Sequence, residues 1–221
     1  MSQDHEKIQV AKAALHYIDP NTILGLGAGS TVTCLLNEIE KAGIELKGVV
    51  TASSAIAEQA DRLRFNVMSI NEVSDLHVYI DGADEVNRSL LCLKGGGGAQ
   101  TLEKVMARMS KEFICIVDQT KLVKLMGKNI PVSIEVINSS RSFVARECRK
   151  LNGRPVYRSN FKTDHGNDII DVYDFDLSQP IKLEETLNQI PGVVGHGLFA
   201  LDRPNLLLVE SNGQIEKIKA K

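Results

Sequence analysis

The stretch TILGLGAGST, residues 22–31, decides the fold class, because a short apolar run leads into glycines and then into hydroxyl side chains. This pattern predicts a buried strand, a tight turn and the start of a helix, and apolar residues at helical spacing follow it. The same order returns in LKGVVTASS, residues 46–54, where Ser53 or Ser54 is expected to cap a helix through Leu63. Continuously apolar strands that alternate with helices are typical of a parallel sheet covered on both faces.

Four further apolar runs predict strands of this first part of the chain: FNVMSI (65–70), HVYIDGADEV (77–86), LLCLKGGGG (90–98) and EFICIVDQTK (112–121). The last of them is the clearest buried strand. An amphipathic helix is expected to open the chain and to end near Asp19 and Pro20, and another is expected over 101–110.

After Lys128 the pattern changes to the order β-α-β-β-α-β, which is the ferredoxin-like split arrangement. Its expected elements are PVSIEVI (131–137), a helix over 142–150, RPVYRS (154–159), NDIIDVYDF (167–175), a helix over 180–189 and GVVGHGLFAL (192–201). We therefore expect a main domain of residues 1–129 plus 201–221 and a smaller domain of residues 130–200. Asn212-Gly213 in the tail predicts a tight hairpin that returns to the main domain.

Composition narrows the class of protein. The net charge of −2 and the pI near 6.2 give no electrostatic footprint for nucleic acid. No apolar run approaches the roughly 18 residues of a membrane helix, and the charged N-terminus differs from a signal peptide. The four cysteines are scattered without a CxxC pair, which is typical of small buried hydrophobes. We expect a cytoplasmic protein with neither a nucleic-acid nor a membrane partner.

The glycine turn of residues 25–31 feeds a helix start, where backbone N–H groups and the helix dipole suit a phosphate. A dinucleotide fingerprint is disfavoured, because Ser30 stands where its third glycine would be. The next strand also ends in Thr51, Ala52 and Ser53 instead of an acidic residue. A plain strand-to-helix turn with an N-cap stays open as the simpler interpretation.

Three carboxylates crowd the stretch Asp81-Gly82-Ala83-Asp84-Glu85, directly after an apolar run. Such a cluster suits a cation, the hydroxyls of a sugar or proton transfer. The five histidines are isolated in the sequence, so a transition-metal site is disfavoured, while a magnesium site or an ordinary capped turn stays open.

Four glycines follow Lys94 and leave bare backbone where a side chain would collide with a ligand. A linker would have polar flanks, whereas a strand and a helix flank this run. Glu103 falls in the first turn of the expected helix. An acidic side chain there interacts favourably with the helix dipole, and this alone would explain its presence. Together with Lys94 and the two aspartates it also fits an enolising enzyme, which needs a base and donors for an oxyanion.

Lys121 follows the clearest strand at an expected helix start and could neutralise a phosphate, although alone it would be read as a surface lysine.

Seven stretches in order resemble the type A ribose-5-phosphate isomerase family: GLGAGST, DGADE, KGGGGA followed by Glu103 and Lys104, DQTKLVKLMG, IEVI, TDHGNDIIDV (163–172) and IPGVVGHGLF (190–199). The resemblance covers nearly the whole chain. It implies a Rossmann-like, mostly parallel α/β domain with a smaller ferredoxin-like α+β domain. It also implies interconversion of ribose 5-phosphate and ribulose 5-phosphate through an enediolate, without metal or organic cofactor, in a homodimer or homotetramer.

The resemblance also implies residue roles. Glu103 corresponds to the general base, Asp81 with Asp84 to the groups that open the sugar ring, and Lys94 to a group that stabilises the enediolate. The remaining substrate-binding positions are Lys7, Ala28, Gly29, Ser30, Thr31, Gly82, Ala83, Gly95, Gly96, Gly97 and Lys121, among which Ser30, Thr31, Lys121 and Lys7 are expected to bind the phosphate.

Two positions depart from the family pattern. Ala28 stands where a threonine is usual, and Leu102 stands where an arginine is usual before the catalytic glutamate. The first removes a hydroxyl near the ligand, and the second affects packing or an ion pair more than the chemistry. The rival functions are a non-catalytic sugar-phosphate sensor, which would lose the base, and a coenzyme A transferase or amino-sugar phosphate deaminase, which lacks the DGADE and KGGGGA pair.

Overall fold

The computed structural model describes residues 3–219 of the 221-residue chain. The chain divides into two compact units. Unit 1 takes residues 1–83, 105–122 and 204–221, and unit 2 takes residues 84–104 and 123–203. The helix α4 (Gln100–Met109) begins in the sequence of unit 2 and ends in that of unit 1.

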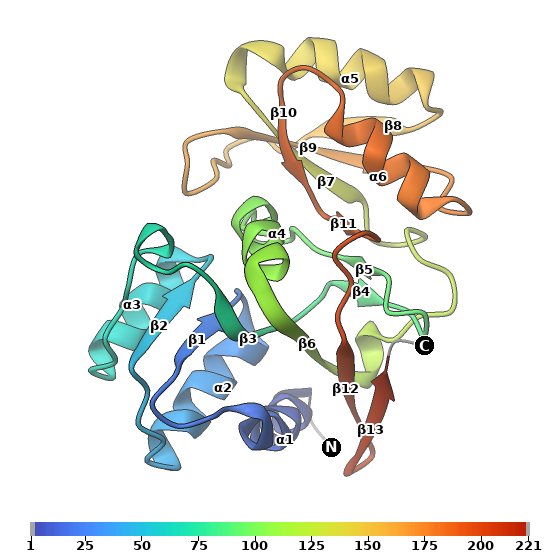
Figure 1. The fold of residues 1–221 in the computed structure, drawn as a ribbon. Helices are drawn as coiled ribbons and strands as arrows, with labels where there is room; N and C mark the ends of the chain where they lie inside the picture. Colours follow the sequence, from blue (N-terminus) through green and yellow to red (C-terminus); the bar gives the residue numbers. More distant parts are fainter. Residues whose placement is uncertain (1–2, 220–221) are drawn as a thin grey trace. The chain divides into compact units, whose positions relative to one another are not determined.

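Unit 1 contains a six-stranded sheet in the order β13-β12-β6-β3-β1-β2 (Figure 1). Its strands are β1 (Ile23–Leu26), β2 (Gly48–Thr51), β3 (Leu76–Asp81), β6 (Ser110–Asp118), β12 (Leu206–Ser211) and β13 (Gln214–Lys219). All neighbours pair in parallel except β12 with β13. The predicted mostly parallel sheet is confirmed, and so is the hairpin, whose residues Asn212 and Gly213 take the positive φ angles of 54° and 84° that a two-residue hairpin turn requires.

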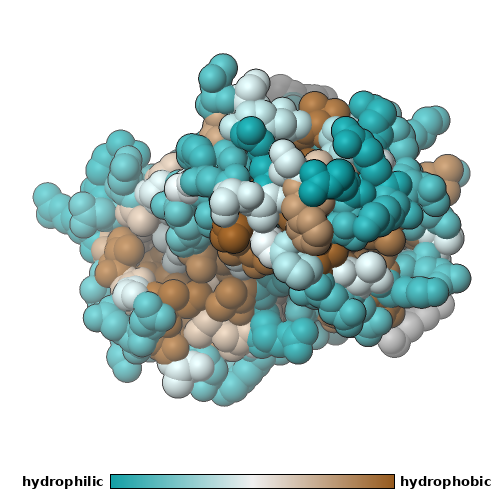
Figure 2. Space-filling model, turned by 90° about the horizontal axis from the view of Figure 1, so that it is seen from above, coloured by the Kyte–Doolittle hydropathy of each residue, from teal (hydrophilic) through white to brown (hydrophobic). Residues whose placement is uncertain are grey.

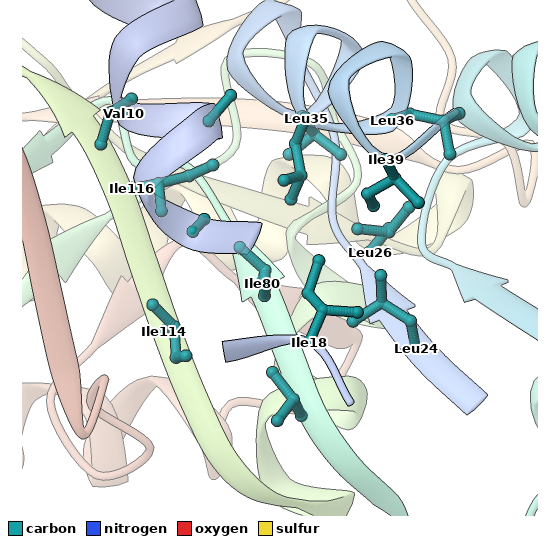
Figure 3. Close-up of a cluster of buried hydrophobic side chains, with 14 of the residues drawn as sticks. Val10, Ile18, Leu24, Leu26, Leu35, Leu36, Ile39, Ile80, Ile114 and Ile116 are labelled. Atoms are coloured by element: carbon teal, nitrogen blue, oxygen red, sulfur yellow. The ribbon is translucent and has the colours of Figure 1, made fainter. Parts of the chain in front are cut away.

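The helices of unit 1 are α1 (Gln3–Ala14), α2 (Ser30–Lys41) and α3 (Ser54–Arg62), with the short 3₁₀ turns η1 (Leu15–Tyr17), η2 (Ile70–Glu72) and η3 (Gln119–Lys121). Apolar residues of α2 recur at helical spacing and meet apolar residues of the parallel strands, so the helix buries one face on the sheet. Figure 3 shows Leu35 and Ile39 of α2 beside Leu26 and Ile80 of the strands, all fully buried. This burial is what the apolar periodicity of the sequence predicts.

Unit 2 contains a four-stranded antiparallel sheet in the order β10-β7-β9-β8. Its elements in chain order are β7 (Val132–Val136), η4 (Asn138–Ser140), α5 (Arg141–Lys150), β8 (Arg154–Tyr157), β9 (Asp168–Tyr173), α6 (Pro180–Asn188) and β10 (Val193–His196). The order of strands and helices confirms the predicted ferredoxin-like arrangement. A three-stranded antiparallel sheet, β11 (Leu198–Phe199), β5 (Cys92–Leu93) and β4 (Glu85–Val86), also lies in unit 2.

Three predicted elements differ from the structure. FNVMSI forms only an isolated bridge from Val67 to Val49 before the chain turns away into η2. The run before the glycines gives the short β5 of the antiparallel sheet, because its partners are β4 and β11 and not the parallel strands. GVVGHGLFAL splits into β10 and β11 at Gly197, whose N–H donates to the Ser133 carbonyl of β7 while its carbonyl accepts from the N–H of Lys94, which follows β5.

The predicted helix start at Lys121 is also wrong, since Lys121 ends the 3₁₀ turn η3.

No helix of the described residues is long and apolar enough to cross a membrane. Figure 2 shows one face of the molecule, on which hydrophilic side chains predominate and hydrophobic ones gather in smaller groups. All four cysteines carry free thiols, and burial raises the pKa of Cys148 to about 11.

His196 is a fully buried histidine of unit 2. Its Nδ1 accepts from the N–H of Leu198, and its Nε2 lies 3.1 Å from Oδ1 of Asn188. Burial, and after it the charge of Lys104, lowers the pKa of His196 from 6.5 to about 3. The folded protein therefore holds a neutral ring that the unfolded chain would protonate below pH 6.5.

We predict a stability loss in acid that depends on this ring. The contribution of neutral His196 is complete above pH 6.5 and falls, by at most about 1.4 kcal/mol per pH unit, as the pH drops toward 3. Urea unfolding between pH 4 and 7 should show a shallower pH dependence in His196→Gln than in wild type. His165→Gln, which changes an exposed histidine of the same unit, is the control and should keep the wild-type slope. Equal slopes in His196→Gln and wild type would contradict the assignment.

Candidate active site

Asp81 ends β3 and is fully buried among hydrogen-bond donors of unit 1. Its Oδ1 accepts from the N–H groups of Ala28 at 3.1 Å and Gly82 at 2.7 Å, and its Oδ2 accepts from the hydroxyl of Tyr79. The Tyr79 ring packs on Phe113 with 4.9 Å between centroids. These contacts fix the orientation of the carboxylate at the carboxyl end of a parallel strand, where ligands bind in open α/β sheets.

Gly27 keeps backbone bare against this carboxylate. A Cβ at position 27 would lie 1.8 Å from Cγ of Asp81 and 2.0–2.1 Å from its two oxygens. The N–H of Gly27 donates to the Ile80 carbonyl, and its own carbonyl accepts from the Thr51 hydroxyl at 3.2 Å. A glycine is required here by close approach, and not by the dinucleotide motif that the sequence also suggested.

The glycine turn ends at the N-terminus of α2. Gly29 is the N-cap with φ 90°, a conformation that favours glycine, and no side chain caps the helix. Ser30 is exposed and begins the helix, followed by Thr31. First-turn N–H groups without a side-chain cap, beside two hydroxyls, have the chemistry of a phosphate site.

The two lysines predicted to bind the phosphate lie on other elements of unit 1. The Lys7 ammonium on α1 is 3.7 Å from Asp4, and Lys121 lies at the end of η3. Among residues 3–219, no hydrogen bond or ion pair joins either lysine to Ser30 or Thr31.

In unit 2, Lys94 and Glu103 form a buried ion pair. Their side chains are 4% and 6% exposed, and Nζ of Lys94 lies 3.3 Å from Oε2 of Glu103. Lys94 directly follows β5, and Glu103 lies in the first turn of α4. The lysine ammonium also lies 5.7 Å from the centre of the Phe199 ring, and its backbone N–H donates to the Gly197 carbonyl. The buried carboxylate of Glu103 could take a proton from a substrate. The buried ammonium of Lys94 beside it could stabilise the negative oxygen that forms on the substrate when the proton leaves.

The glycine loop, residues 95–98, connects these two charged residues. The N–H of Gly96 donates to Oδ2 of Asp84 at 2.8 Å, and the N–H of Gly98 donates to the Gly95 carbonyl. Gly95 and Gly98 have positive φ angles of 114° and 77°, and a Cβ on either would lie under 3 Å from a neighbouring side chain. A Cβ on Gly97 would meet nothing within 4 Å, so this residue faces open space.

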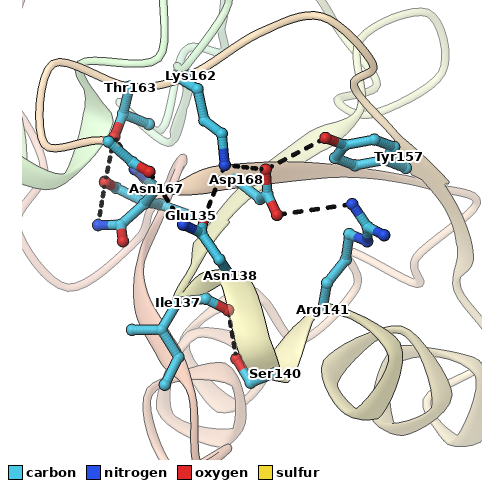
Figure 4. A network of polar contacts seen from close by, with 11 residues as sticks. Glu135, Ile137, Asn138, Ser140, Arg141, Tyr157, Lys162, Thr163, Asn167 and Asp168 are labelled. Carbon is cyan, nitrogen blue, oxygen red and sulfur yellow. Dashed lines mark hydrogen bonds and ion pairs between the residues drawn. The ribbon is translucent and has the colours of Figure 1, made fainter.

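Figure 4 shows a polar network of the small sheet, and one of its residues, Glu135, also contacts Thr101 at the start of α4. The fully buried Glu135 accepts from the hydroxyls of Thr163 and Thr101 and from the amide of Asn167. Thr101 is in the first turn of α4, two residues before the predicted base. The TDHGN stretch therefore contributes to holding this turn in place.

Asp168 belongs to the same region and is held by three partners. Lys162 donates to its Oδ1 at 2.8 Å, and the hydroxyl of Tyr157 donates at 3.2 Å. Arg141 lies 3.6 Å from its other oxygen. The hydrogen bond from Lys162 is the main cause that lowers the pKa of Asp168.

The predicted site residues thus lie in two sets. Unit 1 brings together Ala28, Asp81 and Gly82 by hydrogen bonds, and unit 2 brings together Lys94 with Glu103 and Asp84 with Gly96. Within residues 3–219, no group of three histidine, cysteine, aspartate or glutamate side chains could hold a metal ion.

Two polar residues that contact the site, Tyr79 and Arg158, are not among the site residues predicted from the sequence. Tyr79 lies two residues before Asp81 on the same strand, so the period-two alternation of a strand would have placed both side chains on one face. Arg158, in the quoted RPVYRS stretch, donates to carbonyls of the glycine loop. Only the antiparallel pairing of the small sheet brings it there, and a single sequence carries no signal for that contact.

Known proteins with similar sequences show the family of this chain. A family model described as ribose 5-phosphate isomerase A (phosphoriboisomerase A) matches residues 48–213. Ribose-5-phosphate isomerase A of Haemophilus ducreyi is 44% identical over 209 residues, which is 95% of each chain. The chain belongs to the ribose 5-phosphate isomerase A family.

Solved structures agree with this assignment. Ribose 5-phosphate isomerase A from Neisseria gonorrhoeae aligns with a TM-score of 0.97 and 38% identity, covering 100% of this chain and 98% of that one. A D-ribose-5-phosphate isomerase in complex with phospho-erythronic acid aligns with a TM-score of 0.93 and 32% identity over 99% of this chain and 100% of that one. The predicted resemblance, the α/β class and the isomerase activity are confirmed.

We predict that Gly27→Ala displaces the carboxylate of Asp81. The new methyl group overlaps the carboxyl atoms, so the side chain must leave the donors of Ala28, Gly82 and Tyr79. Overpacking of this kind costs about 1–3 kcal/mol, which should lower the urea midpoint, and isomerase turnover should fall by at least tenfold.

Gly82→Ala is the control for stability, because its Cβ would approach only the Ile116 carbonyl, at 3.8 Å. Its urea midpoint should stay near that of wild type. If Gly27→Ala were as stable and as active as wild type, the close approach would have no role in the site.

Proposed function

We propose that this family member interconverts D-ribose 5-phosphate and D-ribulose 5-phosphate through an enediolate, with Glu103 as the general base. The observation that supports the proposal best is the buried Lys94 and Glu103 pair on either side of the glycine loop. An aldose–ketose isomerisation needs a base at carbon and positive or N–H groups at oxygen, and this pair with its loop offers both.

Glu103 is proposed to act twice on the open-chain sugar. Its carboxylate removes the proton from carbon 2, and the electron pair of that C–H bond forms the double bond between carbons 1 and 2. The carbonyl π electrons move to oxygen 1, which gives the enediolate. The protonated Glu103 then returns the proton to carbon 1, while the proton on oxygen 2 moves to oxygen 1 and leaves a carbonyl at carbon 2.

Lys94 and the glycine loop are proposed to stabilise the oxygen that becomes negative. The ammonium of Lys94 is buried, so its charge acts with little screening by water. The N–H groups of the loop, that of Gly97 in particular, are donors that need no reorganisation when charge develops. The phospho-erythronic acid found in the related structure carries a carboxylate and a phosphate, which fits a site for an enediolate phosphate.

Ring opening is proposed for Asp81, with help from Asp84. The carboxylate of Asp81 takes the proton of the anomeric hydroxyl, and the oxygen left behind forms the carbonyl at carbon 1 as the bond from carbon 1 to the ring oxygen breaks. The ring oxygen then takes the proton from the carboxyl group of Asp81. The three donors on Asp81 hold it in one orientation for this transfer. The neighbouring positions Gly82 and Ala83 are proposed to contact the sugar.

The phosphate is proposed to bind at the start of α2, to Gly29, Ser30 and Thr31, with Lys121 and Lys7 as balancing charges. The uncapped helix N-terminus supports this placement. Ala28 lacks a hydroxyl, and its N–H donates to Asp81, so the anchoring is assigned to the residues that follow it.

A homodimer in the cytoplasm is the proposed working form, in keeping with the four free cysteines of the chain. Light scattering during gel filtration measures the molar mass. A monomer at the concentration of the assay would contradict the dimer, and a mass four times that of the chain would replace it by a tetramer.

The function and the base are tested together with ribose 5-phosphate and EDTA-treated protein, following formation of the ketose. Wild type should convert the sugar, and Glu103→Gln should lose about 10²- to 10⁴-fold in kcat, because glutamine keeps an acceptor oxygen for Lys94 but cannot take a proton. Glu185→Gln, at an exposed carboxylate of unit 2, is the control and should keep wild-type kcat.

Circular dichroism establishes that each variant is folded. A folded Glu103→Gln with near-normal turnover would show that another group is the base. A wild-type protein that binds the sugar phosphate and forms no ketose would defeat the isomerase proposal itself.

A further inference from the structure

Arg158 uses all five of its N–H donors within unit 2. Its Nε and Nη2 donate to the two carboxylate oxygens of Asp171 at 2.8 and 2.6 Å, and Nη2 also donates to the Ser133 hydroxyl at 2.9 Å. Its Nη1 donates to the carbonyls of Gly95 at 3.0 Å and Gly96 at 3.2 Å. A guanidinium has five donors in a planar fork, so this contact set uses the whole group and no lysine could reproduce it.

The consequence for the glycine loop follows from the planarity of the peptide bond. The carbonyl of residue 96 and the N–H of Gly97 point to opposite sides of one trans peptide. While Nη1 of Arg158 holds that carbonyl, the N–H of Gly97 is turned away from the guanidinium. The N–H of Gly96 is taken by Asp84 and that of Gly98 by the Gly95 carbonyl.

Among residues 3–219, the N–H of Gly97, like that of Gly95, has no hydrogen-bond acceptor. A Cβ on Gly97 would meet nothing within 4 Å, so this residue has open space beside its Cα. Glycines are flexible, and without an external contact the peptide between residues 96 and 97 could rotate and lose this direction. Arg158 supplies the contact that prevents the rotation.

The guanidinium itself is held firmly. The side chains of Arg158 and Asp171 are 19% and 14% exposed, and the pairing is bidentate. The guanidinium carbon lies 5.0 Å from the centre of the Phe161 ring, and that ring would collide with a Cβ on Gly98. Asp171 and Ser133 belong to β9 and β7, which are directly paired, so a regular sheet fixes the position of the fork.

We propose that Arg158 is a positioning residue for the isomerisation: it fixes the peptide between Gly96 and Gly97 so that the N–H of Gly97 is aimed at the oxygen that becomes negative in the enediolate. The inference rests on the proposed function, since it assigns Gly97 to the oxyanion that Glu103 generates. It also gives a role to the RPVYRS and IIDV stretches, whose Arg158 and Asp171 lie outside the predicted catalytic set.

The test compares Arg158→Ala with Arg154→Ala in the full-length protein. Arg154 begins strand β8, which Arg158 directly follows. It pairs with Asp174 at 2.8 Å and lies 4.7 Å from the Tyr173 ring centre, but it contacts no residue of the glycine loop. For Arg158→Ala we expect kcat for ribose 5-phosphate to fall about 100-fold, with KM and the inhibition constant of inorganic phosphate within about threefold of wild type. Arg154→Ala should keep all three values.

Chemical rescue distinguishes positioning from a general loss of structure. Guanidinium ion at millimolar concentration, far below denaturing levels, can enter the space left in Arg158→Ala and contact the two glycine carbonyls. It should raise kcat at least tenfold in that variant and leave Arg154→Ala unchanged. Arg158→Lys should fall between wild type and Arg158→Ala in kcat, because an ammonium can reach some of the acceptors but not all of them.

Two results would overturn the proposal. One is a kcat of Arg158→Ala within threefold of wild type. The other is a loss of kcat that guanidinium does not restore and that comes with a matching rise in the phosphate inhibition constant. Glu103→Gln is measured alongside, so that the role of Glu103 as the base and the role of Arg158 in positioning are tested separately. Normal turnover in Glu103→Gln would show that Glu103 is not the base. An inactive Glu103→Gln together with a normal Arg158→Ala would contradict only the positioning role of Arg158.

Discussion

The buried ion pair of Lys94 and Glu103 is the interaction on which the rest of the site depends. Burying two charges is costly, and the cost is recovered only when the partners are held in good geometry. Here the chain holds them by placing Lys94 at the end of a short strand and Glu103 in the first turn of a helix, with four glycines between. The loop can turn this sharply, and expose its N–H groups, because no side chains fill the space.

The loop in turn depends on the small antiparallel sheet of unit 2. Arg158 fixes two of its carbonyls, and Glu135 binds Thr101 at the start of the following helix. Glu135 lies on β7 and Arg158 directly follows β8, so both are far away in the sequence from the glycines. A ferredoxin-like unit that carries none of the predicted catalytic side chains in its own sheet thereby stabilises the backbone that the chemistry uses.

The alternation of apolar strands and helices predicted the parallel sheet and the β-α-β-β-α-β unit, because burial dictates those periods locally. Lys94 was expected to end a strand of the parallel sheet, but β5 pairs with β4 and β11, and such pairing depends on distant partners that a short apolar run does not reveal. The catalytic residues are predicted from motifs, and their roles stay predictions. The predicted domain boundaries, residues 1–129 for the main domain and 130–200 for the small one, also stay predictions. Arg158 could not be predicted, because its contacts exist only once three separate segments have folded.

The central claim is that a sugar phosphate lies against bare glycine backbone with Glu103 at its reacting carbons. The most direct test is a crystal structure of the inactive Glu103→Gln protein with ribose 5-phosphate bound. The account predicts the amide of residue 103 within about 3.5 Å of carbon 1 or carbon 2 and the N–H of Gly97 donating to a sugar oxygen. A sugar bound with its first two carbons away from residue 103, or with the Gly97 N–H directed elsewhere, would contradict it.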